Sequence, residues 1–232
     1  MDSATFRRQH DELTRLLNDP EKLIPVDTER KAFRLVEEYL DQPAAWVLYH
    51  RIICLLDGER ADSEQLMHNC AQHLGEAFTP QLRLRMECDR VISGASYAEL
   101  SYLPGVALAV ASRFGMIQDE LLEAADNQPE CVALARYANG RGTLAARIPD
   151  AAHLMFKMSD EIWGDTVAPK NTPAIRNLVF LLRSAIGLGQ TDEIERVQRR
   201  LRRASSATWA KYASPLMRDD GLAWFAGLNI RW

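Results

Sequence analysis

The sequence predicts an all-α protein of about eleven helices. Apolar residues recur every three or four positions along nearly the whole chain, the spacing that lines one face of a helix. The strict alternation of apolar and polar residues that marks half-buried strands is almost absent. Because 47% of the 232 residues are hydrophobic, the chain can also bury a sizeable core.

Four helices are predicted in the N-terminal part of the chain, each with a recognisable start or stop. Capping residues precede the first and third segments, proline opens the fourth, and glycine follows the second and third. The second segment is apolar on all sides, so we expect it to be central. The four segments span residues 29–40, 44–56, 63–74 and 80–92.

Glycine and proline also divide the rest of the chain. Pro104-Gly105 is predicted to break the apolar run 97–114, and Gly115 to end it. Residues 139–142, Asn-Gly-Arg-Gly, are predicted to form a loop. The polar connection 165–172 is a possible weak boundary within a single all-helical domain of residues 1–232. The further predicted helices lie within 97–114, 117–125, 129–137, 149–163, 173–188, 191–204, 207–212 and 219–228.

The spacing of the predicted helices favours antiparallel hairpins stacked side by side. Helices or hairpins begin near Glu29, Ser63, Ser96 and Pro129, which are 34, 33 and 33 residues apart and close to the 34-residue tetratricopeptide period. The signature residues match poorly, because Gln198 stands where a large apolar residue is wanted. We therefore expect an irregular, tetratricopeptide-like α-solenoid, with a closed helical bundle as the alternative.

Charge and cysteine content narrow the class of protein. A net charge of −4 is too close to balance for a protein that coats DNA or an anionic membrane, so it favours a protein or small-molecule partner. Four cysteines without a Cys-x-x-Cys pair are predicted to be reduced and mostly buried, which indicates the cytoplasm. The polar N-terminus predicts no signal peptide, and no apolar run is long enough to predict a membrane span.

One predicted helix places two histidines near a cysteine. His68 points about 200° away from Cys70 and about 140° away from His73 around the helix axis. A tetrahedral zinc ion cannot collect ligands from such divergent directions on one helix. We therefore expect Cys70 in the core and both histidines half-exposed.

No catalytic constellation stands out. Asp150 and His153 resemble half of a di-iron carboxylate–histidine motif, but a second copy is absent. The polar residues of the helix 149–163, Asp160 among them, are predicted to form its solvated face. The chain also lacks a Gly-x-Ser-x-Gly elbow and a P-loop. We predict no metal, no cofactor and no enzymatic activity. If the chain were an enzyme with a ligand pocket between helices, His50, His153 and Asp160 would be the residues to test.

Four arginines share one face of the predicted helix 191–204, opposite its apolar residues. They are Arg196, Arg199, Arg200 and Arg203. Acidic residues four positions before two of them predict pairing within the helix, Asp192 with Arg196 and Glu195 with Arg199. The stripe is thus predicted to be a solvated and internally paired face, with an acidic protein surface or a nucleic acid as alternative partners.

The C-terminal part of the chain is rich in aromatic residues. Trp209 follows the arginine stripe, and Trp224, Phe225 and Trp232 lie in the final segment 219–232. Large aromatic side chains are rarely left in water. We expect the segment to cap the last open hairpin; the alternatives are a docking peptide or a homodimer contact.

Together these observations predict a non-enzymatic, cytoplasmic, helical protein-interaction module, such as an adaptor, a chaperone-like protein or an assembly factor. Its partner-binding residues would be the four arginines of the stripe together with Trp209, Trp224, Phe225 and Trp232. The alternative is a helical regulator that contacts nucleic acid through the stripe Arg196–Arg203. A helical enzyme is the third possibility.

Overall fold

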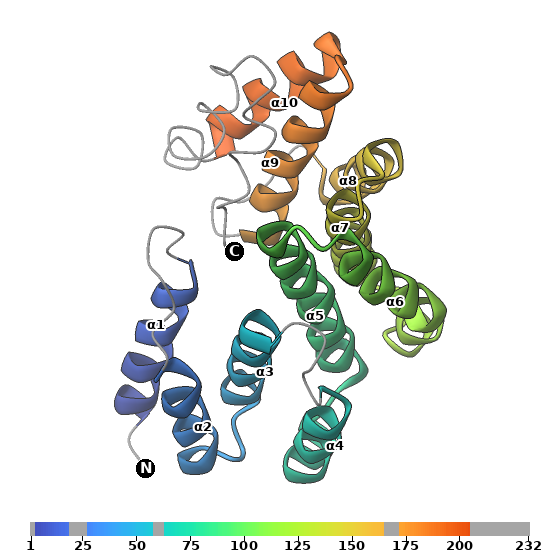
Figure 1. Cartoon of the computed structure of the whole chain (residues 1–232). Coiled ribbons are helices and arrows are strands. Elements are labelled where there is room, and N and C mark those ends of the chain that lie inside the picture. The colour runs from blue at the N-terminus through green and yellow to red at the C-terminus, as the bar shows by residue number, and fades with distance from the viewer. Residues whose placement is uncertain (1–2, 19–26, 58–62, 165–171, 205–232) are drawn as a thin grey trace.

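The computed structural model describes residues 3–18, 27–57, 63–164 and 172–204 (Figure 1). Within these ranges the chain forms helices and turns and no strand, which confirms the predicted all-α class. A single 3₁₀ turn, Gly75–Ala77, follows α4. The ten α-helices are α1 Ser3–Asn18, α2 Thr28–Glu38, α3 Pro43–Asp57, α4 Ser63–Leu74, α5 Pro80–Ser101, α6 Pro104–Ala124, α7 Pro129–Ala145, α8 Pro149–Trp163, α9 Thr172–Gly187 and α10 Thr191–Ala204.

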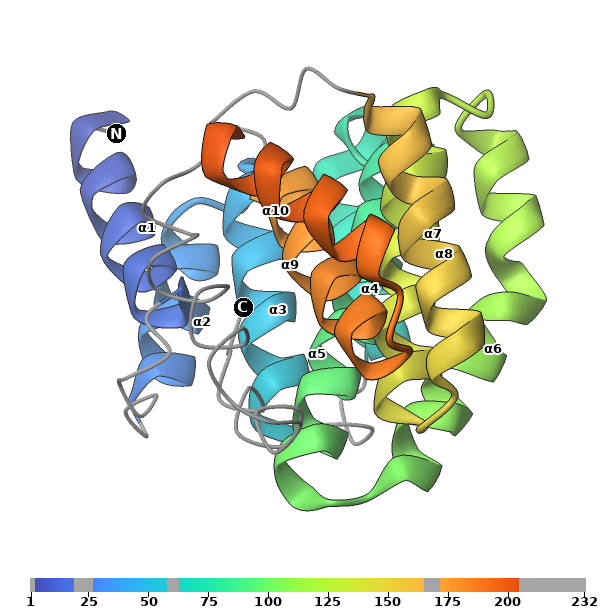
Figure 2. The same cartoon turned by 90° about the horizontal axis from the view of Figure 1, so that it is seen from above.

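The helices pack mostly with their neighbours in sequence, as Figures 1 and 2 show. A second set of contacts joins the odd-numbered helices in series: α1 with α3, α3 with α5, α5 with α7, and α7 with α9. The even-numbered helices make their extensive contacts with odd-numbered neighbours. The odd-numbered helices therefore form a continuous inner row.

Several predicted boundaries are close to the observed ones, and four features differ. Helix α1 was not predicted; it is amphipathic and buries Leu13 and Leu17. The predicted break after residue 92 is wrong because α5 continues through Gly94, whose added Cβ would lie 3.3 Å from Val110 Cγ2 of α6. The predicted stop at Gly115 is also wrong, because α6 continues to Ala124. Gly115 is exposed and lowers the stability of the helix only through the low helix propensity of glycine.

The predicted loop at residues 139–142 is wrong as well, because these residues lie inside α7. A Cβ atom added at Gly140 would lie 2.5 Å from Phe156 Cε1 of α8, and one at Gly142 would lie 2.7 Å from Ala111 Cβ of α6. Real Cβ atoms do not approach so closely, so both positions exclude any larger side chain. The glycines thus bring α7 into close contact with the helices on either side.

Four helices end in the same way, with a residue in the left-handed conformation. At the ends of α5, α6, α7 and α9 a backbone N–H bonds to the carbonyl five residues earlier, the signature of a Schellman turn. The donors are Leu103, Asn127, Ile148 and Gln190, at 2.8–3.0 Å from their acceptors. Of these four turns only the last has glycine at the left-handed position; the others have Tyr102, Asp126 and Arg147 there.

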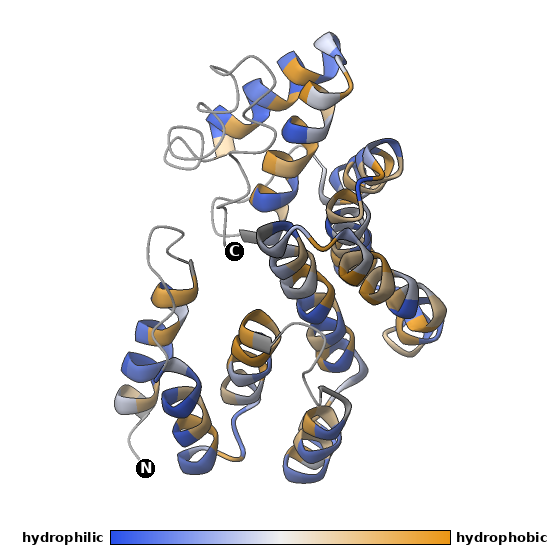
Figure 3. Cartoon of the chain, viewed as in Figure 1, coloured by the Kyte–Doolittle hydropathy of each residue, from blue (hydrophilic) through white to orange (hydrophobic). Residues whose placement is uncertain are grey.

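Two large clusters of buried apolar side chains form the core. One joins α1 to α4, and the other joins α5 to α10. Helix α5 contributes to both, because Met86 faces the first cluster while Leu84 and Cys88 face the second. Three of the four cysteines are buried, Cys131 is partly exposed, and none forms a disulfide, as the sequence predicts. Figure 3 shows hydrophilic and hydrophobic residues side by side along most helices.

None of the described helices is long and apolar enough to cross a membrane. The possible domain boundary and the predicted helices 207–212 and 219–228 lie outside the described residues, apart from Thr172 at the start of α9.

Candidate functional site

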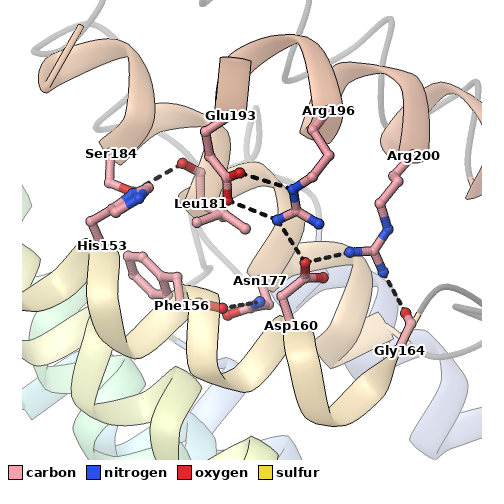
Figure 4. Close-up of polar contacts among 10 residues, drawn as sticks. All are labelled: His153, Phe156, Asp160, Gly164, Asn177, Leu181, Ser184, Glu193, Arg196 and Arg200. Carbon is pink, nitrogen blue, oxygen red and sulfur yellow. Dashed lines mark hydrogen bonds and ion pairs between the residues drawn. The ribbon is translucent and has the colours of Figure 1, made fainter. Parts of the chain in front are cut away.

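The structure divides the predicted arginine stripe of α10 into two parts. Arg196 and Arg200 both reach Asp160 of α8 (Figure 4). The Arg196 Nη2 atom lies 3.1 Å from Asp160 Oδ2 and 2.7 Å from Glu193 Oε1, and Arg200 also donates to the carbonyl of Gly164. These two arginines therefore join α10 to α8.

Arg199 and Arg203, the other half of the stripe, are exposed on α10. The intrahelical partner of Arg196 is Glu193, three residues before it. The aromatic candidates Trp209, Trp224, Phe225 and Trp232 lie outside the described residues. Among the described residues of the predicted partner-binding set, Arg199 and Arg203 are exposed, and the Arg196 side chain is 37% exposed beside Asp160.

Asp160 is buried, so its predicted place on a solvated face is wrong. Burial raises the pKa of its carboxyl group, while the charges of Arg200 and Arg196 and their hydrogen bonds act in the opposite direction. The hydrogen bond from Arg196 lowers the pKa of Glu193. The same pairing raises the pKa of Arg196.

His153 is buried on the same helix, which corrects its predicted exposure. Its Nδ1 atom lies 2.9 Å from Ser184 Oγ of α9, and Ser184 in turn donates to the carbonyl of Leu181 (Figure 4). His153 also interacts with the side chain of Gln190, and the tautomer of the histidine sets which group donates in the bond to Ser184. The His153–Ser184 pair holds α8 against α9.

The other histidines are also accounted for by packing. His50 is buried on α3 with its Nε2 atom 3.8 Å from Cys54 Sγ, and burial lowers its pKa to about 4. Cys70 lies in the core, and His68 and His73 are exposed; the placement of these three residues confirms the prediction. No group of three or more potential metal ligands occurs among the residues that the structure describes.

The sequence analysis missed a group of arginines on the inner row of helices. Arg141 of α7 is fully buried, and its Nη2 atom lies 2.9 Å from Ser96 Oγ and 3.4 Å from Glu99 Oε2 of α5. Its guanidinium carbon lies 3.8 Å from the ring centre of Phe180. Arg183 of α9 lies 3.7 Å from the other oxygen of Glu99. Two buried arginines from different helices thus share one carboxylate.

A second group continues this one along the row. Arg85 and Asp89 of α5 form an ion pair of 3.4 Å, with Arg51 of α3 and Arg176 of α9 close enough to feel both charges. Burial lowers the pKa of Arg51 and Arg176, and the charge of Arg51 helps to bring the pKa of Arg176 to about 10. Both side chains are half-buried. Like charges are therefore held together where water screens them only in part.

Tyr137 of α7 lies between the two groups. Its ring packs against Phe156, Phe180 and Trp163 at centroid distances of 6.2, 6.3 and 6.4 Å. Burial raises the pKa of its hydroxyl, and the charges of Arg141, Arg176 and Arg51 lower it. This hydroxyl is buried and has no hydrogen-bond partner among the residues that the structure describes.

We name these residues the inner arginine cluster. It comprises Arg51, Arg85, Arg141, Arg176 and Arg183, the acids Asp89 and Glu99, and the Tyr137 hydroxyl. Arginine does not give up its proton in proteins, so the arginines of this cluster are unsuited to proton transfer.

A sequence signal for this cluster exists, although it is weak. Arg183 interrupts the apolar run 178–185, and Arg141 stands between two glycines. Charged residues at positions where the helical period calls for apolar ones indicate buried ion pairs or ligand contacts.

No protein-family model, curated protein or solved structure matches this chain. Its function must therefore be argued from the chemistry of its own residues.

Proposed function

We propose that this chain is a non-enzymatic, cytoplasmic binding module that holds a protein partner on a stack of helical hairpins similar to a tetratricopeptide α-solenoid. The observation that carries the proposal is the inner row, in which α1, α3, α5, α7 and α9 contact each other in series. A closed bundle packs helices around one common core, whereas a row of this kind grows by repetition and presents an extended surface.

The polar side chains favour binding over catalysis. His153 and Ser184 are hydrogen-bonded to each other across α8 and α9, and Asp160 is held by two arginines, so these candidates for acid–base chemistry join helices. The arginines of the inner arginine cluster lie on the inner row of helices in a partly buried setting. Such a setting strengthens the attraction to an acidic partner, because less water screens the charges.

The nucleic-acid alternative rests on the arginine stripe alone. With Arg196 and Arg200 bound to Asp160, the described part of the stripe offers Arg199 and Arg203 to a phosphate backbone. Polyanion binding gains affinity from many such contacts, and the chain as a whole carries a net charge of −4. A protein partner is therefore the better-supported proposal.

An affinity capture from the source cytoplasm at low salt tests the proposal, with the full chain as bait and half of the sample treated with nuclease. We expect a stoichiometric protein partner that survives nuclease and is retained by the variant Arg199→Glu/Arg203→Glu. Recovery of nucleic acid alone, lost in that variant, would establish the alternative. A tightly bound cofactor or metal at equal stoichiometry, with no protein, would contradict the proposal in favour of an enzyme.

A further inference from the structure

Helix α6 exposes an uncharged face to solvent. It lies at the edge of the molecule in both views, and its opposite face, which carries Phe114 and Leu121, is buried against its neighbours α5 and α7 (Figures 1 and 2). Between residues 100 and 118 the only charged residue is Arg113, which lies to one side of the exposed face. The exposed residues that share this face at spacings of three or four are Gly105, Leu108, Ala109, Ser112 and Met116.

Exposed apolar side chains are concentrated at this helix. Leu108 is 48% exposed and Met116 is 79% exposed, two turns further along the same face. Tyr102 and Leu103 precede α6 directly, and Ile148 follows the end of α7. These five belong to the nine large hydrophobic side chains that are exposed in the described part of the chain. Apolar side chains gathered in this way indicate a surface that another protein covers.

The C-terminal end of the same helix is acidic. From Phe114 to Ala135 the sequence contains five acids and neither lysine nor arginine. Two of the acids continue the uncharged face by the helical spacing of three and four, so the face ends in negative charge. All five are exposed: Asp119, Glu120, Glu123, Asp126 and Glu130.

The N-terminal end has the opposite character. Val106 of α6 and Ala146 pack against the same small cluster of alanines, so the exposed Arg147 lies beside the first turn of α6. The N-terminus of a helix carries partial positive charge. Leu103 stands at the N-cap of α6, and its side chain cannot accept a hydrogen bond from that turn. Negative groups are therefore favoured at this end of the face.

A second copy of the chain complements this face when its α6 runs antiparallel. With a two-fold axis at Ser112, Leu108 of one copy lies opposite Met116 of the other, and the acidic end of each helix lies over the N-terminal end of its counterpart. The small side chains of Ala109 and Ser112 allow the two helices to approach closely at the centre.

We propose that the chain forms a homodimer through an antiparallel pair of α6 helices. A two-fold contact uses the same patch on both copies, so the patch must be complementary to itself. The exposed face of α6 meets this requirement with an apolar middle and ends of opposite charge. Because it lies opposite the side that packs on α5 and α7, the dimer does not occupy the inner row.

Sedimentation velocity of the full chain over a range of concentrations tests the proposal, and we expect a monomer–dimer equilibrium. Leu108→Glu and Met116→Glu each place an unpaired charge in the middle of the contact and should raise the dissociation constant at least about tenfold. The matched control is Leu154→Glu, which adds the same charge at a leucine of α8 that is 53% exposed, and should change the constant less than about twofold. Circular dichroism of each variant reports whether its helices are retained.

Charge reversal tests the two ends of the contact. Arg147→Glu and Asp119→Arg each bring like charges together across the dimer and should weaken it about threefold or more. The double variant Arg147→Glu/Asp119→Arg restores opposite charges, so its dissociation constant should return to within about threefold of the wild-type value.

A disulfide tests the antiparallel arrangement. Ser112→Cys places the same residue of both copies at the two-fold axis, so mild oxidation should link them. The wild-type chain, which retains the partly exposed Cys131, and Leu154→Cys are the controls and should stay unlinked. Absence of the link in Ser112→Cys, with a dimer that the glutamate variants still weaken, would overturn the antiparallel arrangement.

The inference is overturned if the wild-type chain stays monomeric at every concentration, or if Leu154→Glu weakens the dimer as much as Leu108→Glu does. A dimer that neither Leu108→Glu nor Met116→Glu weakens forms through another surface, which also contradicts the proposal. If the wild type is monomeric and Leu108→Glu instead abolishes capture of the protein partner, the face of α6 binds that partner and not a second copy.

Discussion

Single residues in this protein often act through what they allow their neighbours to do. Gly140 and Gly142 are the clearest examples, because each lets another helix approach to a distance that a Cβ atom would prevent. Arg141, between the two glycines, points to α5, where it contacts Glu99 and Ser96. The same short segment therefore fixes the contacts of α7 on several sides.

A pair of glycine substitutions should have opposite effects on stability. Gly115→Ala adds a methyl group where nothing lies within 4 Å, so we expect a gain of about 0.5–1 kcal/mol in the free energy of unfolding. Gly140→Ala forces its Cβ against the ring of Phe156 and should cost about 1–3 kcal/mol. Urea denaturation measures both. Equal changes in the two variants would contradict the close packing of α7 on α8.

His50 should make stability fall on mild acidification. Burial lowers its pKa from 6.5 to about 4; the charge of Asp89 acts against this shift and that of Arg90 adds to it. Between pH 6.5 and 4 the unfolded chain binds a proton that the folded chain does not, so the free energy of unfolding decreases as the pH falls. The loss from this residue is about 3 kcal/mol in total.

Denaturation curves between pH 7 and 4 test this expectation, with His50→Gln as the comparison. The variant should lose less stability over the range than the wild type does. Identical slopes for the two proteins would show that His50 is not the group that titrates.

At the scale of helices, substitutions in the Schellman turns should raise the stability of the protein. Tyr102 and Arg147 adopt φ values of 56° and 65°, which side chains other than glycine rarely adopt. Tyr102→Gly and Arg147→Gly should therefore stabilise the protein by up to about 1 kcal/mol, whereas Gly189→Ala should destabilise it by a similar amount. Thermal denaturation of the three variants provides the measurement, and a lower melting temperature for both glycine variants would contradict the expectation.

Asp160 is the carboxylate through which Arg196 and Arg200 attach α10 to α8, and Arg200 also donates to the carbonyl of Gly164. Asp160→Asn keeps the shape of the side chain but removes the charge that Arg196 and Arg200 share. We expect hydrogen exchange of the α10 amides to become faster, with little change in α2 or α3. The control is Asp150→Asn, which changes an exposed carboxylate at the start of α8. Unchanged exchange in α10 would mean that its apolar contacts, Val197 and Leu201, hold it alone.

Helix boundaries show which sequence signals determine structure and which are ambiguous. Residues 63–74, 149–163 and 191–204 begin and end as predicted, because caps, proline and the apolar period agree there. Glycine misled the prediction at Gly115 and at residues 139–142, since the sequence does not distinguish a glycine that turns the chain from one that lies inside a helix. Only the tertiary contacts of a glycine show which of these two roles it has.

The candidate site was less predictable than the helices. The arginines of the stripe were found because they share one helix, but their partner Asp160 lies in another, so their engagement was not predictable. The inner arginine cluster draws its members from four helices spread over residues 51–183, and only Arg141 and Arg183 stand out in their own segments. Periodicity within a helix carries no information about which helices meet.

At the scale of the whole molecule, α5 connects two cores that would otherwise be separate. Met86 packs with α1 to α4, and Leu84 packs with the helices that follow. Met86→Ala and Leu84→Ala should each cost about 2–5 kcal/mol. Because distant helices share few contacts in such a row, we expect exchange to increase mainly in α1–α4 for the first variant and in α6–α10 for the second. A uniform increase in both would indicate a single cooperative unit.

The order of these contacts also bears on how the chain folds while it is being synthesised. Since most helices pack against the one before them, each new helix that leaves the ribosome meets a surface already in place. The first core is an exception, because it stays incomplete until Met86 of α5 has emerged. Nascent chains that end before residue 80 would thus expose the apolar faces of α2, α3 and α4. We expect chains of this length to need a chaperone most.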